Sequence, residues 1–257
     1  MKDIIKESLY FSFAGRRSDE FGIINVSVQP GLYEETFMSS RSIRETTVRG
    51  NPKPYFTEVD RQPKSFTLNF AFHKTWNDEL INEVTRWLDT DYYEPLFFSE
   101  NIDKVFYAMP IDDTTLIHNG LKQGYLTLTM RCDSPYSYGH ESTTPWYDCS
   151  SGETVIEFLN RGTLDVRPIV EIKKIEDGDL IITNLSNYSD DFIFTGLLDN
   201  EFLTVYCAEE DIITNIPNVY RFDNFNDHYL SFSYGKNVLN VQGKCKLRFI
   251  YQYIFSS

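Results

Sequence analysis

Residues 65–88 read SFTLNFAFHKTWNDELINEVTRWL and contain the two clearest structural signals in the chain. In the first part, the apolar residues Phe66, Leu68, Phe70 and Phe72 alternate with smaller or polar ones. Successive side chains of a strand point to opposite faces, so apolar residues at every second position fall on one face. The pattern predicts a strand with one buried face.

The second part of this stretch predicts an amphipathic helix. Thr75 is a suitable N-cap, and Asp78 lies where a carboxylate meets the free N–H groups of the first turn. An apolar stripe with helical spacing follows at Leu80, Ile81, Val84, Trp87 and Leu88. An isolated helix of this length is only marginally stable, so we expect it to pack on a sheet.

Further strands are expected on both sides of this pair, and one segment stands apart from them. From 39 to 54 the sequence SSRSIRETTVRGNPKP has few apolar residues among its charges. We expect a long exposed loop or a protruding hairpin there, with Arg41, Arg44 and Arg49 as candidate contact residues. The strands expected around it are 9–13, 96–98, 105–109 and 125–131.

Pro, Gly, Ser and Thr are dense in DSPYSYGHESTTP, residues 133–145, as is typical of a domain boundary. We therefore divide the chain into domains 1–137 and 138–257. The second domain has no helical stripe, and its short β-like runs are separated by turn signals, which favours a two-sheet antiparallel sandwich. The expected strands are 155–159, 168–172, 180–183, 192–195, 202–207, 219–222, 230–234, 238–241 and 246–254.

Composition agrees with two globular, sheet-rich domains. The 257 residues include 20 Phe and 17 Tyr, side chains that are favoured on pleated surfaces and at interfaces. The net charge is −14, and neither half has an excess of basic residues. Because sequence-independent binding to nucleic acid depends on Lys and Arg, we expect no stable binding to DNA or RNA.

No apolar run is long enough to span a bilayer, and the first residues lack the apolar core of a secretory signal. We therefore expect that the chain does not insert into a membrane and that it assembles in a cytosol.

Cys132, Cys149, Cys207 and Cys245 are widely spaced and have no C-x-x-C motif. Buried or inert thiols are the favoured interpretation, with a disulfide and a metal site as alternatives.

The sequence contains no familiar catalytic motif. It lacks the nucleophile elbow, the phosphate-binding loops and the zinc-protease signature, and its four histidines are scattered. The acidic run Glu209, Glu210 and Asp211 is interpreted as solvated loop charge, with calcium binding as an alternative. We predict no catalytic residues, no metal and no cofactor; a glycoside hydrolase is the enzyme class left as an alternative.

Carbohydrate binding is the main alternative function. Aromatic rings stack on sugars, and Trp146 and Tyr188 lie in segments expected to be loops of the second domain. Aromatic residues at this abundance are more often found in cores or interfaces. These two residues are the candidates for a sugar-stacking site on a carbohydrate-binding adaptor.

Several blocks of sequence occur in an order similar to that of a known family. These are FSFAGRRSDEFGIINVSV (11–28), RQPKSFTLNFAF (61–72), RWL (86–88), PLFFSENIDKVFYAM (95–109), GYLTLTMRCDSPYSY (124–138) and NRGTLDVRPIVEI (160–172). Together they resemble the distal tail protein (Dit) family of siphophages, long-tailed bacteriophages. The chain departs from many relatives at residues 48–52, where VRGNP replaces a glycine-rich turn.

This resemblance implies a mostly β, non-enzymatic baseplate protein of the virion tail tip. Its N-terminal domain would be β-barrel-like with one α-helix, similar to tail-tube subunits, and would form a ring. Its C-terminal domain would be a galectin-like antiparallel β-sandwich that docks other components. The implied partners are five further copies in a homo-hexamer, in one ring or two back to back, the tail tube protein, the tail-associated lysin or fibre hub, and receptor-binding proteins.

Overall fold

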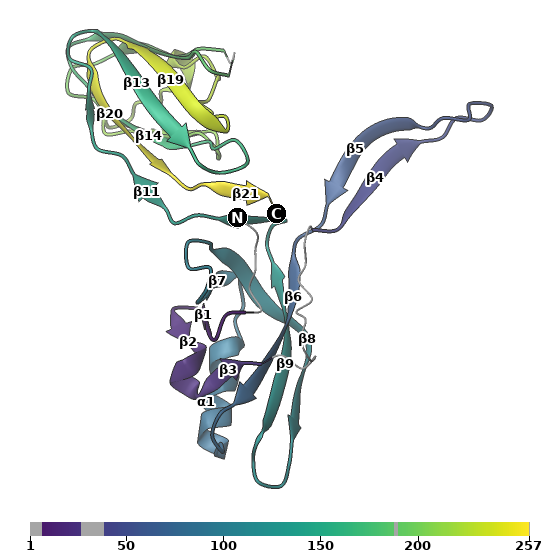
Figure 1. Cartoon of the computed structure of the whole chain (residues 1–257). Helices are drawn as coiled ribbons and strands as arrows, with labels where there is room; N and C mark the ends of the chain where they lie inside the picture. Colours follow the sequence, from purple (N-terminus) through teal and green to yellow (C-terminus); the bar gives the residue numbers. More distant parts are fainter. Residues whose placement is uncertain (1–6, 27–38, 188–189, 257) are drawn as a thin grey trace. The chain divides into compact units, whose positions relative to one another are not determined.

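The computed structural model describes residues 7–26, 39–187 and 190–256. The chain divides into two compact units (Figure 1). Unit 1 comprises residues 1–138 and 256–257, and unit 2 comprises residues 139–255. Each unit has its own hydrophobic core.

Unit 1 is built on a seven-stranded antiparallel sheet with the order β2-β1-β7-β8-β9-β6-β3. Its strands are β1 (Phe11–Phe13), β2 (Arg16–Arg17), β3 (Ile23–Asn25), β6 (Ser65–Phe72), β7 (Glu94–Phe98), β8 (Phe106–His118) and β9 (Gly124–Cys132). A short 3-10 turn, η1 (Ser18–Phe21), lies between β2 and β3, and β10 (Tyr136–Tyr138) follows β9. The expected mostly β class is confirmed, but in the described residues the edge strands β2 and β3 do not pair to close a barrel.

The single α-helix of the described residues, α1 (Asp78–Leu88), is attached to this sheet through Trp87. The indole stacks on Phe21 with ring centroids 4.5 Å apart and on Phe11 at 5.4 Å. Its Nε1–H donates to the carbonyl oxygen of Phe13 at 2.8 Å. A buried indole N–H needs such a partner, so this one side chain fixes the helix on the sheet by packing and by hydrogen bonding.

The N-cap of the helix lies two residues later than expected, at Asn77 instead of Thr75. The side-chain oxygen of Asn77 accepts a hydrogen bond from the backbone N–H of Leu80 at 2.8 Å. The intervening Trp76 is buried against Phe72, with ring centroids 4.9 Å apart. The chain therefore stays non-helical through Trp76 so that this ring enters the core.

The segment expected to be a loop or hairpin is a hairpin of β4 (Arg41–Thr46) and β5 (Tyr55–Arg61). It forms a two-stranded sheet of its own, separate from the seven-stranded sheet. At its base, the hydroxyl of Ser39 donates to the carbonyl oxygen of Pro135 at 2.9 Å.

Unit 2 is an antiparallel two-sheet sandwich. One sheet has the order β11-β20-β14-β17-β18, with β12 also pairing β20, and the other has the order β13-β19-β15-β16. The strands are β11 (Ser142–Thr143), β12 (Tyr147–Asp148), β13 (Glu153–Asn160), β14 (Ile169–Lys174), β15 (Gly178–Asn184), β16 (Phe192–Leu197), β17 (Phe202–Tyr206), β18 (Asp211–Thr214), β19 (Gly235–Gln242) and β20 (Cys245–Tyr251). A 3-10 turn, η2 (Phe222–Asn224), precedes β19, and β21 (Ile254–Ser256) ends the described chain.

Aromatic rings from both sheets meet in the core of unit 2. Phe158 of β13 stacks on Phe232 at 4.3 Å and meets Phe249 of β20 edge-on at 6.1 Å. Alternate residues of the facing strands point into this core, as expected for aligned sheets. The predicted sandwich is confirmed.

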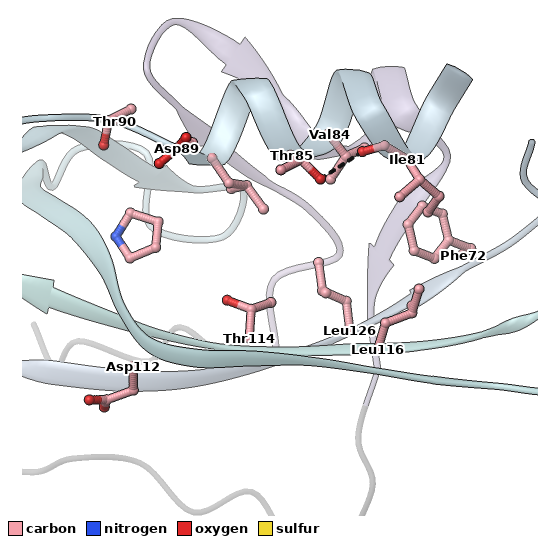
Figure 2. Close-up of a pocket in the computed structure, with 12 residues that line it drawn as sticks. Phe72, Ile81, Val84, Thr85, Asp89, Thr90, Asp112, Thr114, Leu116 and Leu126 are labelled. Atoms are coloured by element: carbon pink, nitrogen blue, oxygen red, sulfur yellow. Dashed lines mark hydrogen bonds between the residues drawn. The ribbon is translucent and has the colours of Figure 1, made fainter. Parts of the chain in front are cut away.

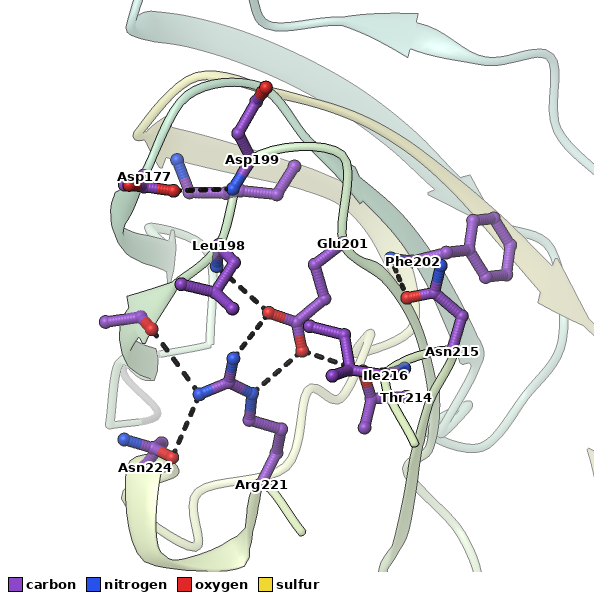
Figure 3. A network of polar contacts seen from close by, with 12 residues as sticks. Asp177, Leu198, Asp199, Glu201, Phe202, Thr214, Asn215, Ile216, Arg221 and Asn224 are labelled. Carbon is purple, nitrogen blue, oxygen red and sulfur yellow. Dashed lines mark hydrogen bonds and ion pairs between the residues drawn. The ribbon is translucent and has the colours of Figure 1, made fainter. Parts of the chain in front are cut away.

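A buried ion pair holds the long connection that follows β18. The guanidinium of Arg221 donates to both carboxylate oxygens of Glu201, at 2.8 and 2.6 Å, and the two side chains are 7% and 0% exposed (Figure 3). Burial alone would raise the pKa of Glu201. Hydrogen bonds from Arg221, the backbone N–H of Leu198 and the hydroxyl of Thr214 outweigh it, so this pKa is lowered.

This pair explains why one predicted strand is absent. Residues 219–222 have a β-like sequence, but in the structure residues 219–221 are irregular and Phe222 begins η2. The side chain of Arg221 turns inward to Glu201 and also donates to Asn224 at 3.1 Å. The expected strand at 230–234 is reduced to a single bridge between Phe232 and Val166, whereas β18 was not expected.

We predict that Arg221→Met destabilises unit 2 by roughly 3 to 5 kcal/mol at pH 7, because it leaves a buried carboxylate unpaired. Urea unfolding of the full chain measures this change. The matched control is Arg167→Met, which breaks an exposed pair with Glu210 and should cost less than about 1 kcal/mol. Equal effects of the two variants would contradict the prediction.

The same pair predicts a pH dependence. The folded-state pKa of Glu201 is lowered, so its contribution to stability is complete above the ordinary glutamate pKa. That contribution is lost as the pH falls through the folded-state value. The stability difference between wild type and Arg221→Met should therefore shrink in acid.

Candidate assembly site

One face of the β4–β5 hairpin groups three apolar side chains, and we call it the apolar face, although Arg41, Glu45 and Arg61 lie on the same side. Ile43 lies opposite Val59, and Glu45, two residues further along β4, lies opposite Phe56. Cross-strand partners share a face, so Ile43, Val59 and Phe56 lie on the same side. Ile43 and Phe56 are 63% and 64% exposed. Large apolar side chains grouped in this way are typical of a surface that another protein covers.

The opposite face of the hairpin is charged. Arg44 lies across from Glu58 and forms an ion pair with it, with 3.0 Å between Nη1 and Oε1. A second pair joins Arg44 to Asp60 at 3.9 Å. These pairs are exposed to water and add little stability. Both faces of the hairpin therefore carry charge, and the grouped apolar side chains distinguish the apolar face.

The three arginines predicted as contact residues have different positions. Arg41 is exposed in β4 opposite Arg61, Arg44 forms the ion pairs above, and Arg49 is exposed in the turn beside Gly50. The apolar side chains of the same hairpin were not predicted as contacts. Strict alternation in YFTEVDR, residues 55–61, would place Phe56 and Val59 on opposite faces, and only the shift in strand pairing between Arg44 and Glu45 brings them to one side.

A cavity of about 530 Å³ lies between α1 and the strands β8 and β9. Figure 2 shows Ile81 and Val84 of the helix above Leu116 and Leu126 of the sheet. The pairing of β8 with β9 shifts between Ile111 and Thr115, in a bulge that moves this strand locally out of register. The lining contains no His, Lys, Arg or Cys, and its two carboxylates belong to Asp89, the C-cap of α1, and Asp112, in the bulge of β8.

The candidate sugar-stacking residues are Trp146 and Tyr188, and Tyr188 lies outside the described residues. Trp146 is 40% exposed. The guanidinium of Arg248, which is paired with Glu171, lies 4.7 Å from the centroid of its ring. Phe202 meets the same ring edge-on at 6.3 Å. Part of the indole surface is thus already occupied within the chain.

In the described ranges, no group of three or more His, Cys, Asp or Glu side chains could hold a metal ion. The four cysteines, all in the described ranges, are buried and form no disulfide. None of the helices in the described part of the chain has the length and apolar character that a bilayer crossing requires.

Comparison with known proteins identifies the family. Residues 6–134 match the model of a phage tail protein N-terminal domain, and residues 136–251 match that of a phage tail C-terminal domain. The chain is also 38% identical over 250 residues to the SPbeta prophage-derived uncharacterized protein YomH of Bacillus subtilis (strain 168), which covers 97% of this chain and 99% of the relative.

The chain belongs to the phage tail protein family. This is a family of structural tail components and not of enzymes. As a member of it, this chain is a component of the virion tail.

A solved structure shares the fold of this phage tail protein over 95% of its length. The crystal structure of the Dit protein of phage SPP1 matches with a TM-score of 0.69 at 14% identity, covering 95% of this chain and 98% of that one. That protein is described as a paradigm of the hub adsorption apparatus in phages that infect Gram-positive bacteria. The phage P2 baseplate in its activated conformation with calcium also matches, at a TM-score of 0.40 and 9% identity over 84% of this chain and 89% of that one. The expected resemblance to the Dit family is confirmed for the fold.

We predict that Phe56→Ser changes the unfolding free energy of the phage tail protein by less than about 0.5 kcal/mol, because the ring is exposed. The control Phe70→Ala removes a buried ring of unit 1 and should cost roughly 3 to 5 kcal/mol. Chemical unfolding monitored by circular dichroism compares them. A large effect of Phe56→Ser would mean that the chain itself covers this face.

Proposed function

We propose that this phage tail protein is the distal tail protein of a long-tailed phage, a structural subunit that forms a hexameric ring. The ring joins the tail tube to the tail-tip adsorption apparatus and leaves a passage for DNA. The observation that carries this proposal is the apolar face of the β4–β5 hairpin, which is solvated in the single chain. The likeness in fold to SPP1 Dit supports it.

In this proposal residues 1–137 form the ring. A two-stranded hairpin is only marginally stable in water by itself, so cover from another chain would stabilise it. The hairpin of one subunit would place Ile43, Val59 and Phe56 on the next subunit or on the tail tube, with its arginines at the edge of the contact. Such a head-to-tail contact forms a closed ring when its rotation closes.

The charge of the chain fits a passage for DNA. Six copies at −14 each would carry −84. A strongly anionic ring repels a polyanion instead of retaining it, so DNA would pass without stable binding.

Residues 138–257 would be a galectin-like docking domain for the tail-associated lysin, the fibre hub or receptor-binding proteins. The connection held by Arg221 presents Tyr220, which is 82% exposed. An aromatic side chain on a fixed support is well suited to anchor a partner, because little conformational entropy is lost on contact. The protein would form one hexameric ring or two such rings back to back.

Light scattering and negative-stain imaging of the purified protein, with and without tail tubes, test the ring. We expect a species of six times the mass of one chain with a central opening. The double variant Ile43→Ser, Phe56→Ser should shift the equilibrium towards monomer at least tenfold. Val155→Ser with Leu159→Ser, two exposed apolar positions of β13, is the matched control and should assemble normally.

Two outcomes would contradict this proposal. A strict monomer that also fails to bind tail tubes would exclude the ring. Normal assembly of the hairpin variant, or of a protein lacking residues 41–61, would exclude the hairpin as its contact.

A carbohydrate-binding adaptor is the second candidate function, favoured by the partly exposed indole of Trp146. If this function operates, the protein should bind immobilised host cell-wall glycans, and Trp146→Ala should reduce binding at least tenfold. Tyr234→Ala, which removes another exposed ring of unit 2, is the control. Glycan-array signals equal to background, or unchanged in Trp146→Ala, would remove this candidate.

A further inference from the structure

Cys149 and Cys245 face each other across two paired strands of unit 2. Strand β12 pairs with β20 through Tyr147 with Leu247 and Asp148 with Lys246. One further step in the same register brings Cys149 opposite Cys245, and the backbone N–H of Cys149 donates to the carbonyl oxygen of Cys245 at 2.9 Å. Directly opposite residues of an antiparallel pair have Cα atoms about 4.5 to 5.5 Å apart. Disulfides span that range.

The two thiols also influence each other. The Cys245 thiol lowers the pKa of Cys149, the Cys149 thiol raises the pKa of Cys245, and both residues are fully buried. The other two cysteines have different surroundings: Cys132 belongs to the core of unit 1, and Cys207 directs its thiol to the carbonyl oxygen of Val205 at 4.0 Å. Only one pair of the four described cysteines is therefore poised for a bond.

We propose that Cys149 and Cys245 form a latent disulfide that closes when the tail protein passes from a reducing cytosol to an oxidising solution. The oxidant is a low-molecular-weight disulfide such as oxidised glutathione. A virion tail component makes this passage when the particle leaves the cell, and disulfides persist only in oxidising surroundings.

The chemistry is two successive thiol–disulfide exchanges. The thiolate of Cys149 attacks the glutathione disulfide, forms a mixed disulfide and releases one glutathione thiolate. The thiolate of Cys245 then attacks the Cys149 sulfur and releases the second. Two protein thiols are oxidised, one glutathione disulfide is reduced to two thiols, and the two protein protons go to solvent or to the released thiolates.

The surroundings favour Cys149 as the first attacking group. Its pKa is lowered, chiefly by the hydrogen bond from the Cys245 thiol, which stabilises the thiolate. On the other side of Cys245 the cross-strand neighbour is Lys174, a buried ammonium that donates to three backbone carbonyls. Its positive charge lowers the pKa of Cys245 and opposes the larger increase that burial and the neighbouring thiol cause.

Access to these buried thiols requires a small local opening. Strand β12 has two residues and pairs only with β20 among the described strands, so it is an edge element. Short edge strands open locally at low free-energy cost without unfolding of the whole domain. Closure of the disulfide would then fix β12 on β20.

The test is oxidation of the reduced full-length protein in glutathione buffers of increasing oxidised fraction under native conditions. After acid quenching and denaturation, free thiols are alkylated with iodoacetamide, and intact mass and peptide mapping follow. We expect four alkylated cysteines in the reduced protein and two after oxidation, with a cross-link between residues 149 and 245. The oxidised protein should melt on the order of 5 to 10 °C higher.

Two variants are matched controls. Cys207→Ala removes a buried thiol outside the pair and should still lose two thiols on oxidation. Cys149→Ala should keep all three of its thiols. Four free thiols in the wild type at every glutathione ratio, a glutathione adduct without a cross-link, or a cross-link to Cys132 or Cys207 would overturn the proposal. Because the wild-type peptide map is decisive by itself, a poorly folded variant would not obscure the result.

Discussion

An antiparallel sheet is stabilised when one of its two faces is removed from water. The sheets of this chain differ in how that face is covered. In unit 1 the seven-stranded sheet is covered by α1, which Trp87 holds in place. In unit 2 two sheets cover each other around Phe158 and Phe232. The β4–β5 hairpin has neither kind of cover, and its apolar face meets solvent in the single chain. In the proposed function, assembly would cover that exposed face.

Local periodicity predicted the elements that depend on local contacts. The alternation at residues 66–72 and the stripe at 80–88 identified β6 and α1, because the burial of one face imposes the same period on the sequence as on the structure. The cap position was less predictable, since Thr75 and Asn77 are both suitable caps. The burial of Trp76 decided between them, and burial is a property of the tertiary structure.

Long-range pairs account for what the sequence could not predict. Residues 219–222 have a strand-like pattern, but Arg221 turns inward to a carboxylate twenty positions earlier in the chain. Likewise, the exposure of residues 39–54 followed from composition, whereas the apolar face depends on which residues of β4 and β5 lie opposite each other. The surroundings of Trp146 come from Arg248 and Phe202, which are remote in sequence. In each case the decisive information is a contact between residues that are not neighbours in the sequence.

In the connection between β18 and β19, one residue holds the backbone in place and its neighbour is exposed to solvent. The inward-pointing arginine keeps the path of the backbone, while the neighbouring Tyr220 contributes almost nothing to the core. Mutations at the exposed position are therefore nearly free of a folding cost, and those at the arginine are not. A lineage could exchange the residues at this tip many times over while keeping the same scaffold. If the proposed docking at this tip is right, the fold tolerates sequence change at the point where a new partner would require it.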